Sequence, residues 1–324
     1  MKAIVQNRYG SADVLKLTEI EKPVVRAGEV LVRVHAAGVD PGVWHLMTGR
    51  PYLIRVMGYG LRAPKWRVRG RDLAGRVEAV GANVTGFRPG DDVFGTSEGS
   101  FADYTSARED RLAPKPANLS FEQAATVPIS AQTALQALRD AGQVRPGQRV
   151  LIIGAAGGVG SFAVQIAKAF GAHVTGVCSG AKADLVRSIG ADDVIDYTRE
   201  DLADRTRRFD LIVDTAGNRS LSHLRRALAP NGTLVIVGGE GGGPWFGMLS
   251  RMIQTGLLAR FVKRHKLRVL SSTESKADLE VLRELIETGK VTPVIDRTYP
   301  LRDVPDAIRY LEQGHARGKV VITV

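Results

Sequence analysis

The residues with the clearest chemistry lie in the stretch 149–160, RVLIIGAAGGVG. An apolar run of the kind that forms a parallel strand buried on both faces ends at Gly154. Apolar residues at helical spacing follow, and an AxGxxG pattern lies between strand and helix. Gly157 would let the backbone approach a pyrophosphate, Gly160 would let the helix pack closely on the strand, and the helix start would attract the phosphate charge. Strand, turn and helix in this order predict a dinucleotide site, with a glycine-rich turn that binds nothing as the alternative.

The end of the next strand, residues 177–182 (VCSGAK), predicts which cofactor is used. Enzymes that prefer NAD place an acidic residue there to bind the ribose 2′-hydroxyl. This stretch instead offers the hydroxyl of Ser179 and the ammonium group of Lys182, which suit a 2′-phosphate. Asp184 comes later, and we expect it inside the next helix and facing away. We therefore predict NADPH rather than NADH; the alternative is that Ser179 is only a helix cap and Lys182 only a surface residue.

Composition limits the class of protein. The chain has 324 residues, 44% hydrophobic and 24% charged, as is usual for a soluble protein with room for two domains. A single cysteine, Cys178, excludes an internal disulfide and a zinc site built on several thiolates. No apolar run of membrane-spanning length and no signal-peptide pattern occurs, so a cytoplasmic enzyme is expected.

The net charge of +11 is concentrated in two segments. The first contains Arg55, Arg62, Lys65, Arg67, Arg69 and Arg71, and the second Arg251, Arg260, Lys263, Arg264, Lys266 and Arg268. Such clusters attract nucleic acid, an anionic membrane surface or a phosphorylated cofactor, although solvated basic faces are the more ordinary interpretation.

The pattern of elements predicts two domains. Residues 1–120 read as short strands separated by Gly, Pro and Asp, with a long apolar and basic loop at 40–70. A helix start at Ser120 with Glu122 and Gln123 introduces alternating strands and helices, which predict a parallel sheet. We expect strands at 150–153, 173–178, 193–195, 209–214, 233–237 and 267–271, and helices at 131–141, from 181, near 200–207, at 218–228 and around 279–286. The tail, about 291–324, is expected to form a helix and a strand that return to the first domain.

Several ordered motifs resemble one family, the zinc-free quinone oxidoreductase branch of the medium-chain dehydrogenase/reductase superfamily. They are MKAIV, AAGVDP, GRDLAGRVEAVG, GFRPGDDVFG, GSFADY, LAPKPANLSFEQAATVPISAQTAL, GAAGGVGSFAVQIAKAFGA, GADDVIDY, FDLIVDTAG and GHARGKVVI. The resemblance implies an α/β fold: a doubly wound parallel six-stranded Rossmann domain over 122–291, and a β-rich GroES-like catalytic domain over 1–121 and 292–324. It also implies a cleft between the domains and a homodimer.

The resemblance also implies residues for the cofactor. Ser179, Lys182 and Tyr197 match the NADPH phosphate site, and Thr133 would approach the nicotinamide ribose. The other matching positions are Ala156, Gly157, Gly158 and Val159 in the turn, Ala216, Gly217 and Gly238 along the cofactor, and Arg317 or Lys319 closing over it.

The metal ligands of the zinc-dependent relatives are replaced in this chain. Those relatives have a Cys where this chain has Asp40 and a His within what is here Gly70-Arg71-Asp72. We therefore predict no metal site, because Asp40 and His45 alone are scattered ligands.

Without zinc to stabilise an alkoxide, hydride transfer favours an acceptor that spreads the incoming charge, such as a quinone or an α,β-unsaturated carbonyl compound. Tyr52 and His45 are the candidate donors to the substrate oxygen, with Asp40 orienting groups near the nicotinamide; each has a packing role as its alternative. Trp44 and Trp66 either line an apolar pocket or merely pack.

Two other functions remain open. One is an RNA-binding protein, which the basic surplus permits. The other is a membrane-associated reductase-like protein, since residues 244–267 mix apolar and basic side chains as interfacial helices do.

Overall fold

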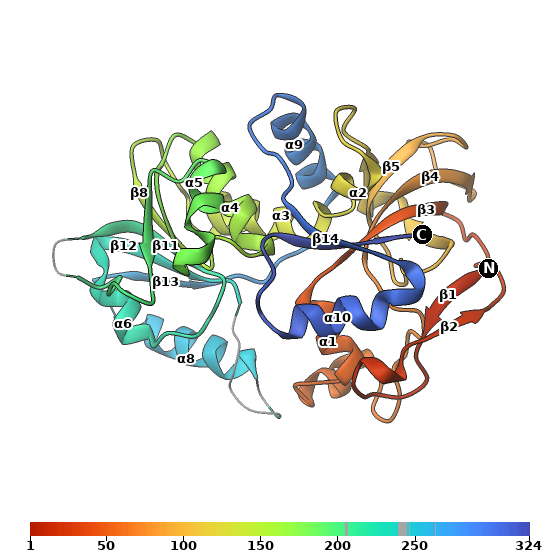
Figure 1. Ribbon diagram of the computed structural model, residues 1–324, viewed down its shortest axis with the longest axis horizontal. Helices are drawn as coiled ribbons and strands as arrows, with labels where there is room; N and C mark the ends of the chain where they lie inside the picture. Colours follow the sequence, from red (N-terminus) through yellow and green to blue (C-terminus); the bar gives the residue numbers. More distant parts are fainter. Residues whose placement is uncertain (205–206, 239–244, 246, 263) are drawn as a thin grey trace. The chain divides into compact units, whose positions relative to one another are not determined.

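The computed structural model describes residues 1–204, 207–238, 245, 247–262 and 264–324, which form two compact units (Figure 1). Unit 1 comprises Met1–Gln132, Glu274–Thr288 and Pro293–Val324, and unit 2 comprises Thr133–Thr273 and Gly289–Thr292. Over the described ranges, no helix is long and apolar enough to cross a membrane.

Unit 2 is built on a six-stranded sheet in the order β10-β9-β8-β11-β12-β13, with every neighbouring pair parallel. The strands are β8 (Arg149–Ile153), β9 (His173–Cys178), β10 (Asp193–Asp196), β11 (Phe209–Asp214), β12 (Leu228–Ile236) and β13 (Lys266–Val269). The order reverses between β8 and β11, which makes this the predicted doubly wound Rossmann sheet.

Helices cover both faces of this sheet, α4 and α5 on one side and α6 and α8 on the other (Figure 1). These four helices are α4 (Gly158–Ala169), α5 (Ala183–Ser188), α6 (Leu221–Arg226) and α8 (Met248–Phe261). A further helix, α3 (Pro128–Gln136), begins in unit 1 and leads into a π-helical turn of unit 2, Ala137–Ala141. Leu151, Ile212 and Leu234, one on each of three central strands, are fully buried because the helices exclude water from both faces.

The prediction of a helix near 200–207 is wrong for the described part of that stretch. Leu202 and Ala203 form a turn instead, and 205–206 lie outside the described residues. The Asp201 carboxylate accepts a hydrogen bond from the Ala203 N–H at 3.0 Å, so a local side-chain bond competes with the helix.

Unit 1 is β-rich, as predicted. A hairpin of β1 (Lys2–Val5) and β2 (Lys16–Glu19) accompanies a seven-stranded sheet ordered β14-β15-β3-β4-β5-β7, with β6 also paired to β3. Its strands are β3 (Glu29–Val39), β4 (Asp72–Val80), β5 (Asp92–Thr96), β6 (Tyr104–Arg108), β7 (Leu112–Pro114), β14 (Ile295–Pro300) and β15 (Lys319–Thr323). The tail therefore joins the N-terminal strands, because β15 pairs antiparallel with β3.

The helices of unit 1 are short. They are α1 (Pro41–Thr48), α2 (Phe121–Ala124), α9 (Lys276–Glu287) and α10 (Val304–Glu312), with a π-helical turn η2 at Arg55–Tyr59. The predicted helix start at Ser120 is confirmed as a capping box: Ser120 Oγ accepts from the Gln123 N–H at 3.2 Å, and Gln123 Oε1 accepts from the Ser120 N–H at 3.0 Å.

A buried ion pair joins three segments of unit 1. The Lys319 ammonium group on β15 donates to Asp72 Oδ2 on β4 at 3.2 Å and to Ser130 Oγ on α3 at 2.9 Å. Asp72 Oδ1 accepts from the Ile129 N–H at 2.9 Å, and the side chains of Lys319 and Asp72 are only 2% and 0% exposed. The pair has been taken out of water completely, so each charge depends on the other.

Substitution of Lys319 by Met is therefore expected to lower the free energy of unfolding by about 3–5 kcal/mol, because it leaves the Asp72 carboxylate buried without its counter-charge. The double variant Asp72→Asn/Lys319→Met removes both charges and should regain more than half of that loss. Urea denaturation of the cofactor-free protein measures both. A double variant no more stable than Lys319→Met would contradict this account.

Candidate functional site

The glycine-rich turn of unit 2 has the backbone that a phosphate site requires. Gly154 follows β8 with φ +80°, and Gly157 stands at the N-cap of α4. A Cβ on Gly160 would lie 2.0 Å from the Gly154 carbonyl oxygen, whereas one on Gly157 would meet only that oxygen, at 3.3 Å. Gly160 therefore allows α4 to pack on the strand, and Gly157 leaves open the approach to the first turn of α4.

Three predicted cofactor segments meet at the carboxyl ends of neighbouring strands. The Thr215 hydroxyl donates to the Ile153 carbonyl at 2.7 Å, which joins the turn after β11 to the end of β8. A Cβ on Gly154 would lie 3.5 Å from the Ala216 Cβ, and one on Gly238 would lie 2.7 Å from the Thr215 carbonyl oxygen. The turn at 154–158, Ala216–Gly217 and Gly238 are thus brought together at the point where the strand order reverses, which is where such sheets bind nucleotides.

A second buried ion pair holds the turn after β11. Asp214 accepts from the Gly217 N–H at 2.9 Å and from the Arg251 guanidinium at 2.6 Å. Arg251 also donates to the carbonyls of Gly217 at 3.0 Å and Arg219 at 2.6 Å. Burial raises the pKa of Asp214, and the Gly217 and Arg251 hydrogen bonds act against this rise.

The loop after β9 holds the residues predicted to bind a 2′-phosphate. Ser179 is half-buried at the start of a short 3-10 turn, Gly180–Lys182, and its side chain makes no capping hydrogen bond there. The Tyr197 ring is half exposed, with the Arg219 guanidinium 5.9 Å from its centre. Asp184 is in α5 and exposed, as expected, and pairs with Arg187.

One group near this loop was missed by the sequence analysis. The parallel register of β10 and β9 places Asp196 opposite Cys178, and the Asp196 carboxylate accepts from the Gly180 N–H. Hydrogen bonds from Thr198 lower the pKa of Asp196, so that it is charged at neutral pH. Asp196 is distant in sequence from Ser179, and the pattern that indicates it is the alignment of the VIDY strand with the neighbouring strand.

The side chains or backbone groups of the remaining predicted cofactor residues, Thr133, Arg317 and Lys319, have partners outside the three turns described above. Thr133 on α3 is buried and its hydroxyl donates to Ser272 Oγ at 3.1 Å. Arg317 donates its backbone N–H to Asp296 at 3.0 Å. Lys319, predicted to close over the cofactor, has its ammonium group in the buried pair with Asp72.

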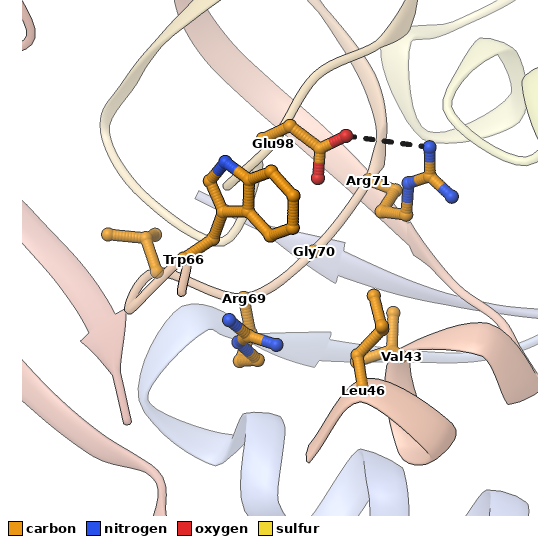
Figure 2. A pocket seen from close by; sticks show the side chains of 8 residues that line it. Val43, Leu46, Trp66, Arg69, Gly70, Arg71 and Glu98 are labelled. Atoms are coloured by element: carbon orange, nitrogen blue, oxygen red, sulfur yellow. Dashed lines mark ion pairs between the residues drawn. The ribbon is translucent and has the colours of Figure 1, made fainter. Parts of the chain in front are cut away.

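Unit 1 contains a pocket beside α1 (Figure 2). It is lined by Val43, Leu46, Trp66, Val68, Arg69, Gly70, Arg71 and Glu98. Of the two tryptophans singled out from the sequence, Trp66 lines this pocket. Trp44 does not; it packs against the core of unit 1 and donates its indole N–H to Glu312.

Arg71 belongs to a network of alternating charges on one side of the pocket. Its guanidinium pairs with Glu274 and, at 3.6 Å, with Glu98, as the dashed line in Figure 2 marks. Arg111 pairs with the same two carboxylates, at 3.1 Å from Glu274 and 3.5 Å from Glu98. Burial disfavours the charge on Arg71, but Glu274 and Glu98 outweigh this and raise the pKa of its guanidinium.

Asp40 is the N-cap residue of α1, and only one of its two carboxylate oxygens has a hydrogen-bond partner among the described residues. Its Oδ1 accepts from the Gly42 N–H at 2.7 Å, while Oδ2 is buried without a hydrogen-bond partner among the described residues. Burial raises the pKa of the neighbouring Asp72 from the ordinary 3.8 to about 6, the Lys319 charge opposes this rise, and the Asp40 charge adds to it.

The other two predicted catalytic residues are not among those lining the pocket. His45 is on α1 with Nδ1 2.9 Å from the Arg50 carbonyl oxygen. The Tyr52 ring lies 4.8 Å from the Arg55 guanidinium carbon. Their roles as donors to a substrate remain predictions.

The positions that match the zinc ligands of other relatives are Asp40 and the segment Gly70-Arg71-Asp72. The guanidinium of Arg71 carries a positive charge and is engaged by two carboxylates. Across the described residues, no group of three or more His, Cys, Asp or Glu side chains is placed to hold a metal.

The interpretation of the two basic segments as solvated surfaces holds for only some of their residues. Arg62, Lys65 and Arg67 are exposed, but Arg69 is buried, as are most of Arg71 and Arg251. In the 244–267 segment, Trp245, Ile253 and Leu257 are exposed, while residues 244, 246 and 263 lie outside the described part. The burial of these three arginines could not be read from the local sequence. Arg71 and Arg251 are buried against carboxylates distant in sequence, and Arg69 lies in the wall of the pocket.

Comparisons with known proteins agree with both units. Residues 26–117 match the family model described as the alcohol dehydrogenase GroES-like domain, and residues 189–322 the one described as zinc-binding dehydrogenase. The mitochondrial NAD(P)H oxidoreductase RTN4IP1 of Bos taurus is 33% identical over 357 residues, covering 100% of this chain and 89% of the relative. The chloroplastic NADPH-dependent alkenal/one oxidoreductase of Arabidopsis thaliana is 36% identical, covering 99% and 79%. The structure of the quinone oxidoreductase from Coxiella burnetii matches with a TM-score of 0.86 at 30% identity, covering 100% of this chain and 99% of that one.

The pKa of Asp72 gives a pH dependence of stability. Its folded value of about 6 lies above the ordinary 3.8, so the folded protein binds the proton more tightly and gains stability as the pH falls through this window. Relative to an Asp72→Asn variant, the wild type should therefore become more stable between about pH 7 and about pH 4. Urea denaturation across that range tests this; parallel curves for the two proteins would contradict it.

The two glycines of the turn should separate folding from cofactor binding. Gly160→Ala forces a methyl group into the backbone of Gly154 and should destabilise unit 2 by about 3 kcal/mol or more. Gly157→Ala should keep the fold and weaken NADPH binding about tenfold or more, because the methyl group blocks close approach of the pyrophosphate. Thermal unfolding and NADPH fluorescence titration measure the two effects. Unchanged NADPH binding by folded Gly157→Ala would refute the assignment of this turn.

Proposed function

Because the chain belongs to the quinone oxidoreductase branch of the medium-chain dehydrogenase/reductase superfamily, we propose that it transfers hydride from NADPH to a quinone or an α,β-unsaturated carbonyl compound. At the level of the family it is an oxidoreductase with a nicotinamide cofactor. What we propose beyond the family is the use of NADPH in preference to NADH and of a quinone or conjugated carbonyl compound as the acceptor.

The observation that carries the proposal is the meeting of three turns at the carboxyl ends of β8, β11 and β12. Gly157 gives access to the start of α4, where free N–H groups and the helix dipole favour a pyrophosphate. Asp214 and Arg251 fix the Ala216–Gly217 turn from below, so that this wall of the site is rigid before the cofactor arrives.

The choice of NADPH depends on a balance of charges around Ser179. The Lys182 ammonium group and the Arg219 guanidinium beside Tyr197 favour a phosphate, while the Asp196 carboxylate opposes it. Arg199 lies 3.9 Å from Asp196 and offsets part of its charge. The positive groups outnumber the negative one, and a relative is named as NADPH-dependent, which together support the phosphorylated cofactor.

The acceptor class follows from the groups available to stabilise charge. At the positions of zinc ligands in other relatives this chain has a carboxylate, Asp40, and a guanidinium, Arg71. A Lewis acid favours reduction of a simple ketone because the charge is localised on one oxygen, whereas the delocalised charge of an enolate or phenolate can be stabilised by hydrogen-bond donors. A pocket with arginine side chains and the apolar Val43, Leu46 and Trp66 supplies donors and a surface for a planar conjugated molecule.

Spectrophotometric loss of NADPH against a panel of quinones, enals, enones and simple ketones tests this function. We expect turnover of the conjugated acceptors, little with the ketones, and no change when a chelator is present. In Lys182→Ala the KM for NADPH should rise about tenfold or more while that for NADH stays constant, since only the 2′-phosphate is affected. Arg187→Ala, in the helix α5 that follows Lys182, is the matched control. Equal rates with NADH and NADPH in the wild type, or loss of activity on chelation, would contradict the proposal.

A further inference from the structure

Arg69 is a buried charge that the protein itself does not neutralise. Its side chain lines the pocket of unit 1 and the residue is 5% exposed. No hydrogen bond or ion pair reaches its guanidinium from any described residue, and its Nε is buried without a partner. In Figure 2 it carries no dashed line, whereas Arg71 is joined to Glu98.

The backbone holds Arg69 in this position. Its N–H donates to the Ile4 carbonyl at 3.2 Å, and its carbonyl accepts from the Phe101 N–H at 2.8 Å. Gly70, next in the chain, has φ +92°, and a Cβ there would lie 2.7 Å from the Phe101 nitrogen. The segment therefore has little freedom to turn the guanidinium out to solvent.

The neighbouring charges compensate Arg69 only in part: the Glu98 charge acts against the lowering of its pKa by burial, but Glu98 forms its ion pairs with Arg71 and Arg111. Glu98 and Glu274 are shared between Arg71 and Arg111, so that this set of four is balanced without it. The hydroxyl of the nearby Tyr9 donates to the carbonyls of Tyr59 and Gly60, at 2.9 and 2.7 Å. The pocket consequently carries one positive charge in excess.

An uncompensated buried charge is costly, and it persists where a ligand of opposite charge completes it. Burial lowers the pKa of Arg69 to about 10, which still leaves the guanidinium protonated at neutral pH. A planar guanidinium presents paired N–H donors that match the two oxygens of a carboxylate.

We propose that Arg69 anchors a carboxylate of the substrate, and hence that the acceptors reduced by this enzyme are acidic quinones or enones. Trp66 and Leu46, which line the same pocket, supply an apolar wall for the conjugated part. The inference rests on the proposed reductase function for its substrate class, but the anion site itself does not.

The kinetic test compares trans-benzoylacrylate with its methyl ester, which differ in charge at one end of the same enone. The wild type should have the higher kcat/KM for the acid, and Arg69→Met should lower that value about tenfold or more, mostly through KM, while changing the ester less than about twofold. Arg69→Lys, which keeps the charge but not the planar pair of donors, should lie between. Arg67→Met is the matched control, because Arg67 is exposed in the same segment and its side chain hydrogen-bonds only Asn7 among the described residues.

A binding test separates this inference from the reductase function. Tryptophan fluorescence of the cofactor-free protein is titrated with benzoate and with uncharged benzamide. Benzoate should bind more tightly than benzamide in the wild type and lose this advantage in Arg69→Met, whose thermal unfolding temperature should not fall, since a buried charge has been removed. Charge-selective binding without NADPH oxidation of either enone would refute the reductase function and leave the anion site standing. Reduction of both enones with the same acid-to-ester ratio in wild type and Arg69→Met would overturn the inference and leave the reductase function standing.

Discussion

The structure of unit 1 depends on the buried ion pair between Lys319 and Asp72. Hydrogen bonds from Ile129 and to Ser130 complete it, so that the last strand, β4 and the start of α3 converge on one carboxylate and one ammonium group. The two buried charges must stay close together, because a longer distance between them weakens the attraction that offsets the cost of removing each charge from water. Asp72 follows directly after Arg69, Gly70 and Arg71, and the pair therefore also fixes the segment that lines the pocket.

Unit 2 uses the same device at the end of β11. Asp214 holds the Ala216–Gly217 turn through backbone N–H groups and is itself held by Arg251, which in turn donates to two carbonyls of the same loop. A loop that contacts a cofactor has few apolar contacts of its own, so its rigidity has to come from polar ones. In both units a buried aspartate holds the surrounding backbone in place, Asp72 at the start of β4 and Asp214 at the end of β11.

The sequence predicted the elements best where burial follows a local pattern. The strands of the parallel sheet are apolar on both faces, and the capping box at Ser120 lies within four residues, so both could be read directly. The helix near 200–207 was wrong because an Asp201 turn competes with it. Asp196 was missed because its neighbours Cys178 and Gly180 come from the adjacent strand β9 and the turn after it. Side-chain partners that depend on register or on tertiary contacts leave no trace in a stretch of consecutive residues.

Arg69 and Arg71 illustrate this limit at the candidate site. They lie two residues apart in a basic segment, where composition gives no reason to separate them, yet Arg71 is paired with two carboxylates and Arg69 with none. Natural proteins satisfy buried charges nearly everywhere, and exceptions concentrate at sites where a ligand supplies what is missing. The same reasoning sets Asp40 apart, whose buried Oδ2 also lacks a partner among the described residues, although a carboxylate there favours a cation or a donor and not an anion. Asp40 thus offers a hydrogen-bond acceptor and Arg69 a set of donors, and only the donors suit the oxygen atoms of an acidic, conjugated acceptor.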